Sequence, residues 1–147
     1  MVSRLGDGVF WYVLMAAMPL IAWASGRGVA QGLWISLEML AAGAFGLLLY
    51  KALKKKLVRE RPYIGLIGIE CAMPPLDRYS FPSGHTLHAV MFTAIAISHV
   101  PALAVLLVPF ALMVAASRVV LGLHYPTDVL AGALLGALIA QGSNWLF

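Results

Sequence analysis

The chain has 147 residues, of which 62% are hydrophobic and only 11% are charged. A soluble domain carries about a quarter charged residues, because it must coat its surface with polar groups. The composition therefore excludes a water-soluble globular protein, and it excludes a disordered chain as well. The single cysteine, Cys71, excludes an internal disulfide framework and a multi-cysteine metal site. We expect an integral membrane protein with one domain, residues 1–147.

Five apolar runs predict an all-α membrane bundle of about five transmembrane helices. They cover residues 9–25, 29–50, 87–100, 102–122 and 129–147. As a helix, the second run is about 33 Å long, which is enough to cross a bilayer. Backbone polar groups in lipid must be bonded internally, and no run alternates as a barrel strand does. Helices are therefore the only spans that we expect.

The first run also has some features of a cleaved signal peptide. Ala22-Trp23-Ala24 resembles a cleavage site, and Arg4 could supply the positive start. However, Asp7 cancels the charge of Arg4, and Trp11 and Pro19 interrupt the apolar stretch that a signal peptide needs. We expect a helix that is retained.

Small residues recur in the last run, where Gly132 and Gly136 are four residues apart. This spacing lets two helix backbones approach closely. We expect tight packing inside the bundle rather than a dimer seam, and the sequence assigns no oligomeric state.

Six of the ten Lys and Arg residues lie between Lys51 and Arg61. One interpretation is a juxtamembrane cluster that binds anionic lipid head groups. We expect that role for Lys51, Lys55, Lys56 and Arg59.

Other polar residues form three short motifs, at residues 54–62, 82–85 and 117–128. Lys54, Arg61 and Arg118 are cations that can converge on one anion, with the planar guanidinium groups matched to phosphate oxygens. Ser83 and Gly84 open the third helix, whose free N–H groups form a ready anion site. Gly84 allows close approach because it has no Cβ.

The same motifs contain a set of residues for nucleophilic catalysis. Asp128 can accept a hydrogen bond from one nitrogen of His124, which leaves the other nitrogen free to attack. His85 can then protonate a leaving alkoxide. The carboxylates are too few, and the histidines too widely spaced, for a metal site. Because the helices alternate in direction, all three motifs are expected on one membrane face.

These motifs resemble the three-part signature of the type 2 phosphatidic acid phosphatase superfamily, in order and in internal spacing. The matching residues are Lys54, Arg61-Pro62, Pro82-Ser83-Gly84-His85, Ser117-Arg118, His124 and Asp128. The resemblance implies metal-independent phosphoester hydrolysis through a phosphohistidine, with no cofactor. It implies that His124 is the nucleophile, Asp128 its orienting partner and His85 the acid. It also implies that the phosphoryl oxygens are held by Lys54, Arg61, Ser83, Gly84 and Arg118. Bacterial lipid phosphatases of this family usually have six helices, whereas we count five.

The predicted function is therefore hydrolysis of a lipid phosphate or diphosphate in the bilayer, with no nucleic acid partner. Candidate substrates are a polyprenyl diphosphate, phosphatidylglycerophosphate and phosphatidic acid. One alternative is a phosphotransferase that passes the phosphate from one lipid to another. A second is a non-catalytic membrane protein that binds anionic lipids through its basic loop, against which the set of His85, His124 and Asp128 argues. Residues 64–80 could form a short lid.

The orientation in the membrane rests on two arguments that disagree. The family's usual topology places the active face outside a bacterial inner membrane, whereas the positive-inside rule places these cations in the cytoplasm. Catalysis would account for Lys54, Arg61 and Arg118 on the outside, but it does not account for Lys55, Lys56 and Arg59. We expect the outward orientation because of the resemblance.

Three further polar residues have open roles. Glu38 lies midway along the second run, where an ionised carboxylate is costly. We expect a neutral or hydrogen-bonded interior glutamate rather than a residue of a lipid groove. His88 follows His85 on the same helical face and could contact substrate or pack between helices. His99 is expected at the opposite membrane interface.

Overall fold

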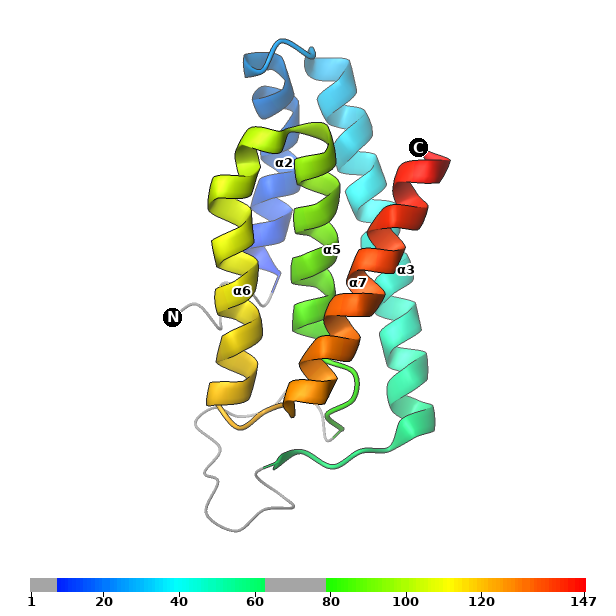
Figure 1. Ribbon diagram of the computed structural model, residues 1–147. Coiled ribbons are helices and arrows are strands. Elements are labelled where there is room, and N and C mark those ends of the chain that lie inside the picture. Colours follow the sequence, from blue (N-terminus) through cyan, green and yellow to red (C-terminus); the bar gives the residue numbers. More distant parts are fainter. Residues whose placement is uncertain (1–7, 63–78) are drawn as a thin grey trace.

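The computed structural model describes residues 8–62 and 79–147, and these form a bundle of helices that run side by side (Figure 1). The elements in chain order are α2 (Val9–Ala24), α3 (Val29–Leu57), α5 (Gly84–His99), the short 3-10 turn η1 (Pro101–Leu103), α6 (Ala104–Val120) and α7 (Pro126–Leu146). The described residues form no strand, so the predicted all-α fold class is confirmed.

The outer surface of the bundle is apolar. Leu48 on α3, Val105 on α6 and Leu130 on α7 are 69%, 85% and 68% exposed. By length and composition, three segments of the described chain can cross a membrane: Val29–Leu57, Pro101–Val120 and Pro126–Leu146. Val9–Ala24 is a shorter apolar helix beside them. An apolar surface of this extent suits hydrocarbon rather than water, and the chain is an integral membrane protein.

Some helix boundaries lie beyond the ends of the predicted apolar runs. α3 continues to Leu57, beyond the predicted end at residue 50. Its last turn holds three lysines, which are good helix formers and interact favourably with the negative end of the helix dipole. α5 begins at Gly84, as the expectation that Ser83 and Gly84 open this helix required, three residues before the apolar run. α7 begins at Pro126 rather than residue 129, since proline suits the first helical position and Asp128 accepts the N–H of Tyr125.

α5 is the central helix, and it lies unusually close to α7. It contacts α3, α6 and α7, and nine of its sixteen residues are buried. A Cβ on Gly132 would lie 2.5 Å from the carbonyl oxygen of Ser83, and one on Gly136 would lie 2.4 Å from that of Leu87. Only glycine fits at these two positions. The predicted tight packing inside the bundle is confirmed.

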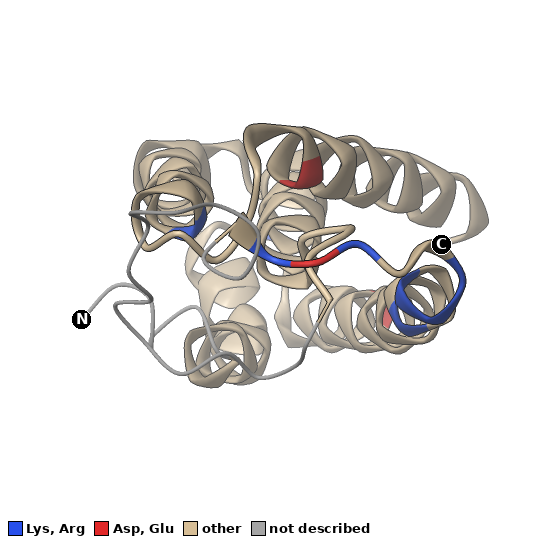
Figure 2. Ribbon diagram, turned by 90° about the horizontal axis from the view of Figure 1, so that it is seen from below, with Lys and Arg blue, Asp and Glu red and all other residues tan. Residues whose placement is uncertain are grey.

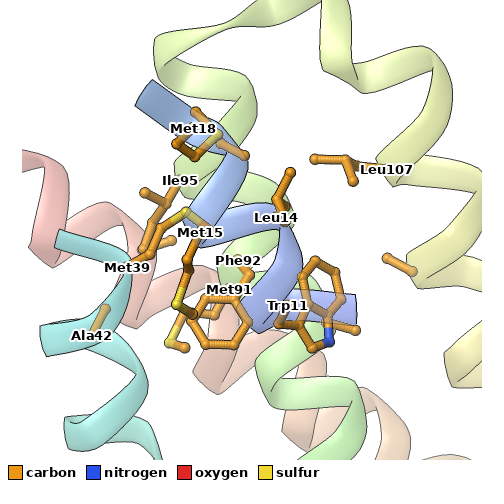
Figure 3. Close-up of a cluster of buried hydrophobic side chains, with 14 of the residues drawn as sticks. Trp11, Leu14, Met15, Met18, Met39, Ala42, Met91, Phe92, Ile95 and Leu107 are labelled. Atoms are coloured by element: carbon orange, nitrogen blue, oxygen red, sulfur yellow. The ribbon is translucent and has the colours of Figure 1, made fainter. Parts of the chain in front are cut away.

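A hydrophobic core joins α2 to the rest of the bundle (Figure 3). The ring centroid of Trp11 lies 5.4 Å from that of Phe92 on α5 and 5.6 Å from that of Phe110 on α6. Met18, Met39 and several other apolar side chains of the same cluster are fully buried around these rings. Aromatic rings at such separations contribute packing beyond their buried area.

A buried polar cluster ties together three helices away from the predicted motifs. Glu38 on α3 is fully buried, and its Oε2 lies 2.7 Å from Nε2 of His99 at the end of α5. Its Oε1 accepts a hydrogen bond of 2.8 Å from Ser143, in the last turns of α7. The prediction of a hydrogen-bonded interior glutamate is confirmed. Because polar groups in hydrocarbon need internal partners, this cluster holds α3, α5 and α7 in register.

The close contact of α5 and α7 predicts a difference between two glycine-to-alanine variants in α7. We expect Gly136→Ala to destabilise the protein by about 1–3 kcal/mol, because its methyl group would overlap backbone atoms of α5. Gly142→Ala is the matched control, since a Cβ there meets nothing within 4 Å. We expect it to leave the melting temperature unchanged or to raise it. Thermal unfolding of the two variants in detergent measures the difference, and equal melting temperatures would contradict the role of this contact.

Candidate active site

Three polar segments meet at one end of the bundle, the lower end in Figure 1. They are the end of α3 with the segment that follows it, the start of α5, and the connection from α6 to α7. Figure 2 shows this end, with basic residues coloured along the end of α3 and basic and acidic residues along the segment that crosses the bundle. The structure thus places the predicted site residues at one face, as the alternating helix directions required.

The first segment places Lys54 and Arg61. Lys54 lies in the last turn of α3 and is only 8% exposed. The helix ends at Leu57. Its C-cap residue, Val58, has a φ of 30° in the left-handed region, and the chain then extends across the end of the bundle. Its course is fixed by Ser80, whose N–H donates to the carbonyl of Arg59 at 2.8 Å. Arg61 is 3% exposed, and its Nη1 donates to the carbonyl of Leu123 at 2.9 Å.

The second segment is the start of α5. Ser83 is the N-cap residue, and its hydroxyl lies 3.0 Å from that of Thr86. Gly84 is packed closely, because a Cβ there would lie 3.3 Å from the ring of Tyr50. His85 follows in the first turn and is partly exposed. The N-terminal end of the helix, with its partly positive charge, therefore opens at this face.

The third segment supplies Arg118, His124 and Asp128. Arg118 lies in the last turn of α6 and is 3% exposed. Its carbonyl accepts the N–H groups of Leu123 and His124, each at 3.1 Å, and so folds the connection back onto α6. α7 then begins, with the Asp128 carboxylate accepting the N–H of Tyr125 at 2.9 Å. The backbone carbonyl of Asp128 accepts the N–H of Ser83 at 3.1 Å, which joins this segment to the second one.

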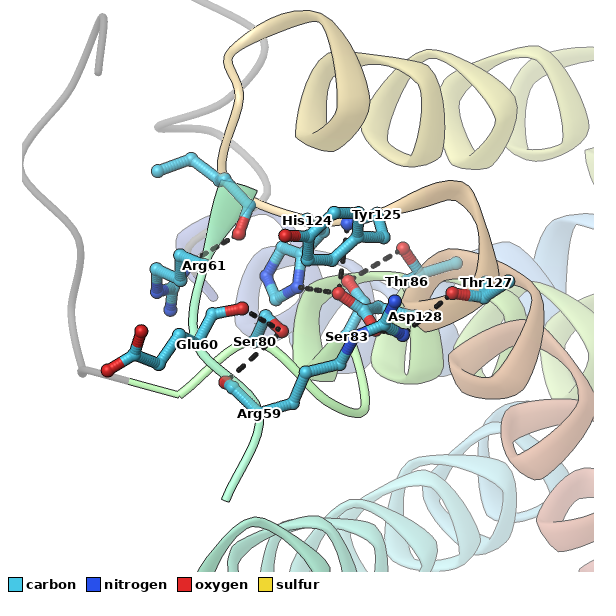
Figure 4. Close-up of polar contacts among 11 residues, drawn as sticks. Arg59, Glu60, Arg61, Ser80, Ser83, Thr86, His124, Tyr125, Thr127 and Asp128 are labelled. Atoms are coloured by element: carbon cyan, nitrogen blue, oxygen red, sulfur yellow. Dashed lines mark hydrogen bonds and ion pairs between the residues drawn. The ribbon is translucent and has the colours of Figure 1, made fainter. Parts of the chain in front are cut away.

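His124 and Asp128 form a buried pair at the centre of the site (Figure 4). His124 is 3% exposed and Asp128 is fully buried. Nδ1 of His124 lies 3.8 Å from Oδ2 of Asp128, within ion-pair range but longer than a hydrogen bond. Within the described part of the chain, Nδ1 has no partner at hydrogen-bond distance. Catalytic hydrogen bonds are often long before substrate binds and tighten in the complex.

The surroundings of His124 favour its neutral form. Burial lowers the pKa of the imidazole below 6.5, and the positive charges of Arg61 and Lys54 lower it further. Asp128 opposes both effects and raises the pKa, as a facing carboxylate must. A neutral imidazole has one nitrogen with a free lone pair, so His124 has the form that a nucleophile needs at neutral pH.

Arg59 is a member of this site that the sequence prediction placed elsewhere, at lipid head groups. Its Nη1 donates to Oδ1 of Asp128 and to Oγ1 of Thr127, both at 2.8 Å. Its guanidinium carbon also lies 4.2 Å from the centroid of the Tyr125 ring. Arg59 lies two residues before Arg61, and residues two apart in an extended chain point to the same side. This spacing is the sequence signal for the role of Arg59, but it applies only if the segment is extended. The prediction did not assign an extended segment.

The site carries a large excess of positive charge. Across the described residues of this end, seven Lys and Arg side chains stand against two acidic ones, Glu60 and Asp128. Lys55 and Lys56 are exposed, whereas Lys54, Arg61 and Arg118 are buried. Such an arrangement attracts an anion and binds its oxygens. Among the described residues, no group of three or more His, Cys, Asp or Glu side chains could hold a metal ion.

Other predicted residues lie outside this arrangement or outside the described residues. Nδ1 of His88 lies 2.8 Å from the carbonyl oxygen of Gly84, and its Nε2 lies 3.4 Å from that of Gly43 on α3. This geometry is that of helix packing, one of the two predicted roles. Cys71 and most of the predicted lid at 64–80 lie outside the described residues.

An apolar groove with a cavity volume of about 490 Å³ lies between α3 and α7. It is lined on one side by Ala41, Phe45 and Leu49 and on the other by α7, from Leu135 to Leu146. Leu49 lies between one and two turns before Lys54 in the same helix. The end of the groove nearest the site therefore lies at Leu49, and along α7 the groove runs away from the site to Leu146.

Comparison with known proteins identifies the family. Residues 32–147 match the sequence profile of the PAP2 superfamily. The chain is 39% identical to decaprenylphosphoryl-5-phosphoribose phosphatase of Mycolicibacterium smegmatis, over 88% of this chain and 67% of that protein. It is 35% identical to phosphatidylglycerophosphatase B of Bacillus subtilis, over 72% of this chain and 55% of that protein.

A solved structure shows the same fold. It is the crystal structure of a transmembrane PAP2 type phosphatidylglycerolphosphate phosphatase from Bacillus subtilis, with a TM-score of 0.76 and 28% identity. The similarity covers 99% of this chain and 72% of that one. The profile match spans most of the chain and includes all three motifs, so the protein belongs to the PAP2 superfamily.

Proposed function

We propose that this protein is a membrane phosphatase that hydrolyses a lipid phosphate or diphosphate through a phosphohistidine on His124. The observation that carries the proposal is the buried pair of His124 and Asp128 at the end of the bundle where three buried cations gather. A nucleophile beside a charge clamp is the arrangement that phosphoryl transfer requires. The named relatives are phosphatases, which supports this reaction class.

The first step transfers the phosphoryl group from the lipid to the enzyme. His124 carries its proton on Nδ1, which faces Asp128, so the lone pair of Nε2 attacks phosphorus. The N–P bond forms while the bond from phosphorus to the lipid oxygen breaks. His85 donates a proton to the departing alkoxide, and the lipid leaves as an alcohol, or as a monophosphate if the substrate was a diphosphate. Asp128 stabilises the positive imidazole that results.

The second step releases phosphate. His85 is now neutral and takes a proton from a water molecule, whose oxygen attacks phosphorus. The N–P bond breaks, its electron pair returns to Nε2, and inorganic phosphate departs. His124 and His85 then have their starting protonation states, so the cycle closes without a cofactor.

The proposed phosphate ligands surround the reacting atom from three elements. Lys54, Arg61 and Arg118 neutralise the phosphoryl oxygens, and the hydroxyl of Ser83 and the N–H groups that open α5 from Gly84 onward donate to them. Fixed positive groups in a buried site stabilise a transition state strongly, because they need no reorganisation as charge develops.

The proposed substrate is a lipid because the site opens at the end of an apolar bundle. The groove between α3 and α7 could hold a hydrocarbon chain while the phosphate lies among the cations. The names of the relatives support two lipid classes, a polyprenyl-linked phosphate and a glycerophospholipid phosphate. Polyprenyl diphosphate, phosphatidylglycerophosphate and phosphatidic acid are therefore the substrates to compare.

The first test of the proposal is phosphate release from these three lipids in detergent, with EDTA present. We expect the wild-type protein to release phosphate from at least one lipid. We expect His124→Ala to reduce the rate by about 1,000-fold or more, because the nucleophile is lost. Lys56→Gln, which changes an exposed cation, is the control and should retain activity. Full activity in His124→Ala, or a strict requirement for a divalent metal, would contradict the mechanism.

The second test is the dependence of kcat/KM on pH. Attack requires neutral His124, so activity is lost as the pH falls through the pKa of this group, which burial holds below 6.5. Asp128→Asn removes a charge that raises this pKa, so the acid limb should move to lower pH while kcat falls by about 100-fold or more. The ionisation of the substrate is the same for both enzymes and cancels in the comparison. An acid limb that moves upward in Asp128→Asn would refute this assignment.

The third test concerns orientation. We propose that the site faces the outside of a bacterial inner membrane, as the usual topology of the family suggests, although the positive-inside rule favours the reverse. In a Cys71→Ser background, a cysteine at Lys55 should react with a membrane-impermeant maleimide in intact cells. A cysteine at Arg27, in the connection between α2 and α3 at the opposite end, should react only after lysis. The reverse pattern would place the site in the cytoplasm.

A further inference from the structure

We propose that Arg59 is a positioning residue of this site, which acts through Asp128 to hold the carboxylate toward His124. The inference rests on the proposed function, in which Asp128 orients the nucleophile. It concerns a residue that lies between Lys54 and Arg61 but is not one of the three-part signature residues.

The geometry around Arg59 fixes its guanidinium group from three sides. Nη1 donates to Oδ1 of Asp128 and to Oγ1 of Thr127, each at 2.8 Å. The guanidinium lies over the ring of Tyr125 at 4.2 Å. All three partners lie at the start of α7, so Arg59 clamps the first turn of the helix that carries Asp128 (Figure 4). A guanidinium can stack and donate at the same time, which a lysine ammonium cannot do equally well.

The two oxygens of Asp128 have separate partners. Oδ1 accepts from Arg59, whereas Oδ2 accepts the N–H of Tyr125 at 2.9 Å and faces Nδ1 of His124 at 3.8 Å. Because Asp128 is fully buried, water does not readily replace Arg59 at Oδ1. Without Arg59 the carboxylate can turn to satisfy this oxygen, so Oδ2 is no longer fixed at Nδ1 of His124, although the negative charge stays beside the imidazole. A displacement of this kind at a catalytic pair lowers kcat by about 10- to 100-fold.

Loss of Arg59 would also change the charge that His124 experiences. The charged groups that act on His124 are Asp128 at the start of α7, Lys54 on α3 and Arg61 in the extended segment. His85 and Arg118 lie at the same end of the bundle, on α5 and α6. Arg59 offsets the negative charge of Asp128. With Arg59 neutralised, that charge stabilises protonated His124 more strongly, and the acid limb should move to higher pH.

The competing explanation is the head-group contact that the sequence suggested, since the side chain of Arg59 is 39% exposed. A residue that only attracts anionic lipid would change KM and leave kcat and the acid limb unaltered. A residue with only a structural role would lower the yield of folded protein or kcat, again without moving the limb. The pH profile therefore separates positioning from both of these roles.

The experiment compares wild type, Arg59→Gln, Arg59→Lys and the matched control Lys55→Gln in mixed micelles. Lys55 is an exposed cation of the same region, so its change alters the net charge equally without touching Asp128. We expect Arg59→Gln to lower kcat by about 10- to 100-fold, with KM within about twofold and the acid limb raised by about half a pH unit or more. Arg59→Lys should keep the limb near its wild-type position but recover only part of kcat. Lys55→Gln should match wild type in kcat and in the position of the limb.

An unchanged kcat in Arg59→Gln, a rise in KM alone, or a lower kcat with an unmoved acid limb would each overturn the inference. If Arg59→Gln does not give a monodisperse protein, the Arg59→Lys variant provides the test. A reduced kcat at nearly constant KM would support the positioning role, and a wild-type kcat would refute it. An active wild type that loses activity in His124→Ala but not in Arg59→Gln would leave the proposed function intact and reject this inference alone.

Discussion

The close contact between α5 and α7 sets the geometry of the whole site. Gly132 and Gly136 present no side chain to α5, so the carbonyl groups of Ser83 and Leu87 lie directly against the backbone of α7. Helix axes ordinarily lie about 8–10 Å apart, at a distance set by the side chains between them. Here the start of α5 comes near enough to α7 for the N–H of Ser83 to bond the carbonyl of Asp128 at 3.1 Å. The helix N-terminus proposed to bind phosphate and the helix that carries Asp128 are therefore fixed to each other by backbone contacts.

Much of this arrangement follows from the sequence because it depends on helix direction alone. Once the apolar runs are helices, Lys54, His85, Arg118 and Asp128 must lie at one end of the bundle. The glycine spacing in α7 likewise indicates a close helix contact. Both arguments use the periodicity and length of the apolar runs, so they remain valid if the predicted helix ends are wrong by several residues. The extended segment after α3 could not be predicted in this way. It depends on Val58 in a left-handed conformation and on backbone pairing of Arg59 with Ser80, a contact between residues far apart in the chain.

The partner of Glu38 was hidden from the sequence for a similar reason. A carboxylate in an apolar helix indicates that a partner exists, but His99 and Ser143 are 61 and 105 residues away. The same limit applies to Arg59, whose partners lie 68 and 69 residues along the chain. In both places the sequence identifies a costly charge, and only the packing of helices identifies what satisfies it. The two clusters have different consequences. The cluster of Glu38 joins three helices within the bundle, whereas the cluster of Arg59 lies beside His124, the proposed nucleophile.

In the proposed mechanism, the cations of the site act both on the substrate and on His124. Lys54 and Arg61 are proposed to hold phosphoryl oxygens, and their charges also lower the pKa of His124. Cations placed to bind an anion therefore also favour the neutral form of His124, and burial acts in the same direction. Asp128 must oppose this effect, because an imidazole that never accepts positive charge cannot carry a phosphoryl group. Arg59 donates to Oδ1 of that carboxylate and so offsets part of the negative charge that acts on His124. If His124 is the nucleophile, as proposed, each cation that favours phosphate binding also alters its pKa. A substitution at any of them should change the pH dependence together with the rate.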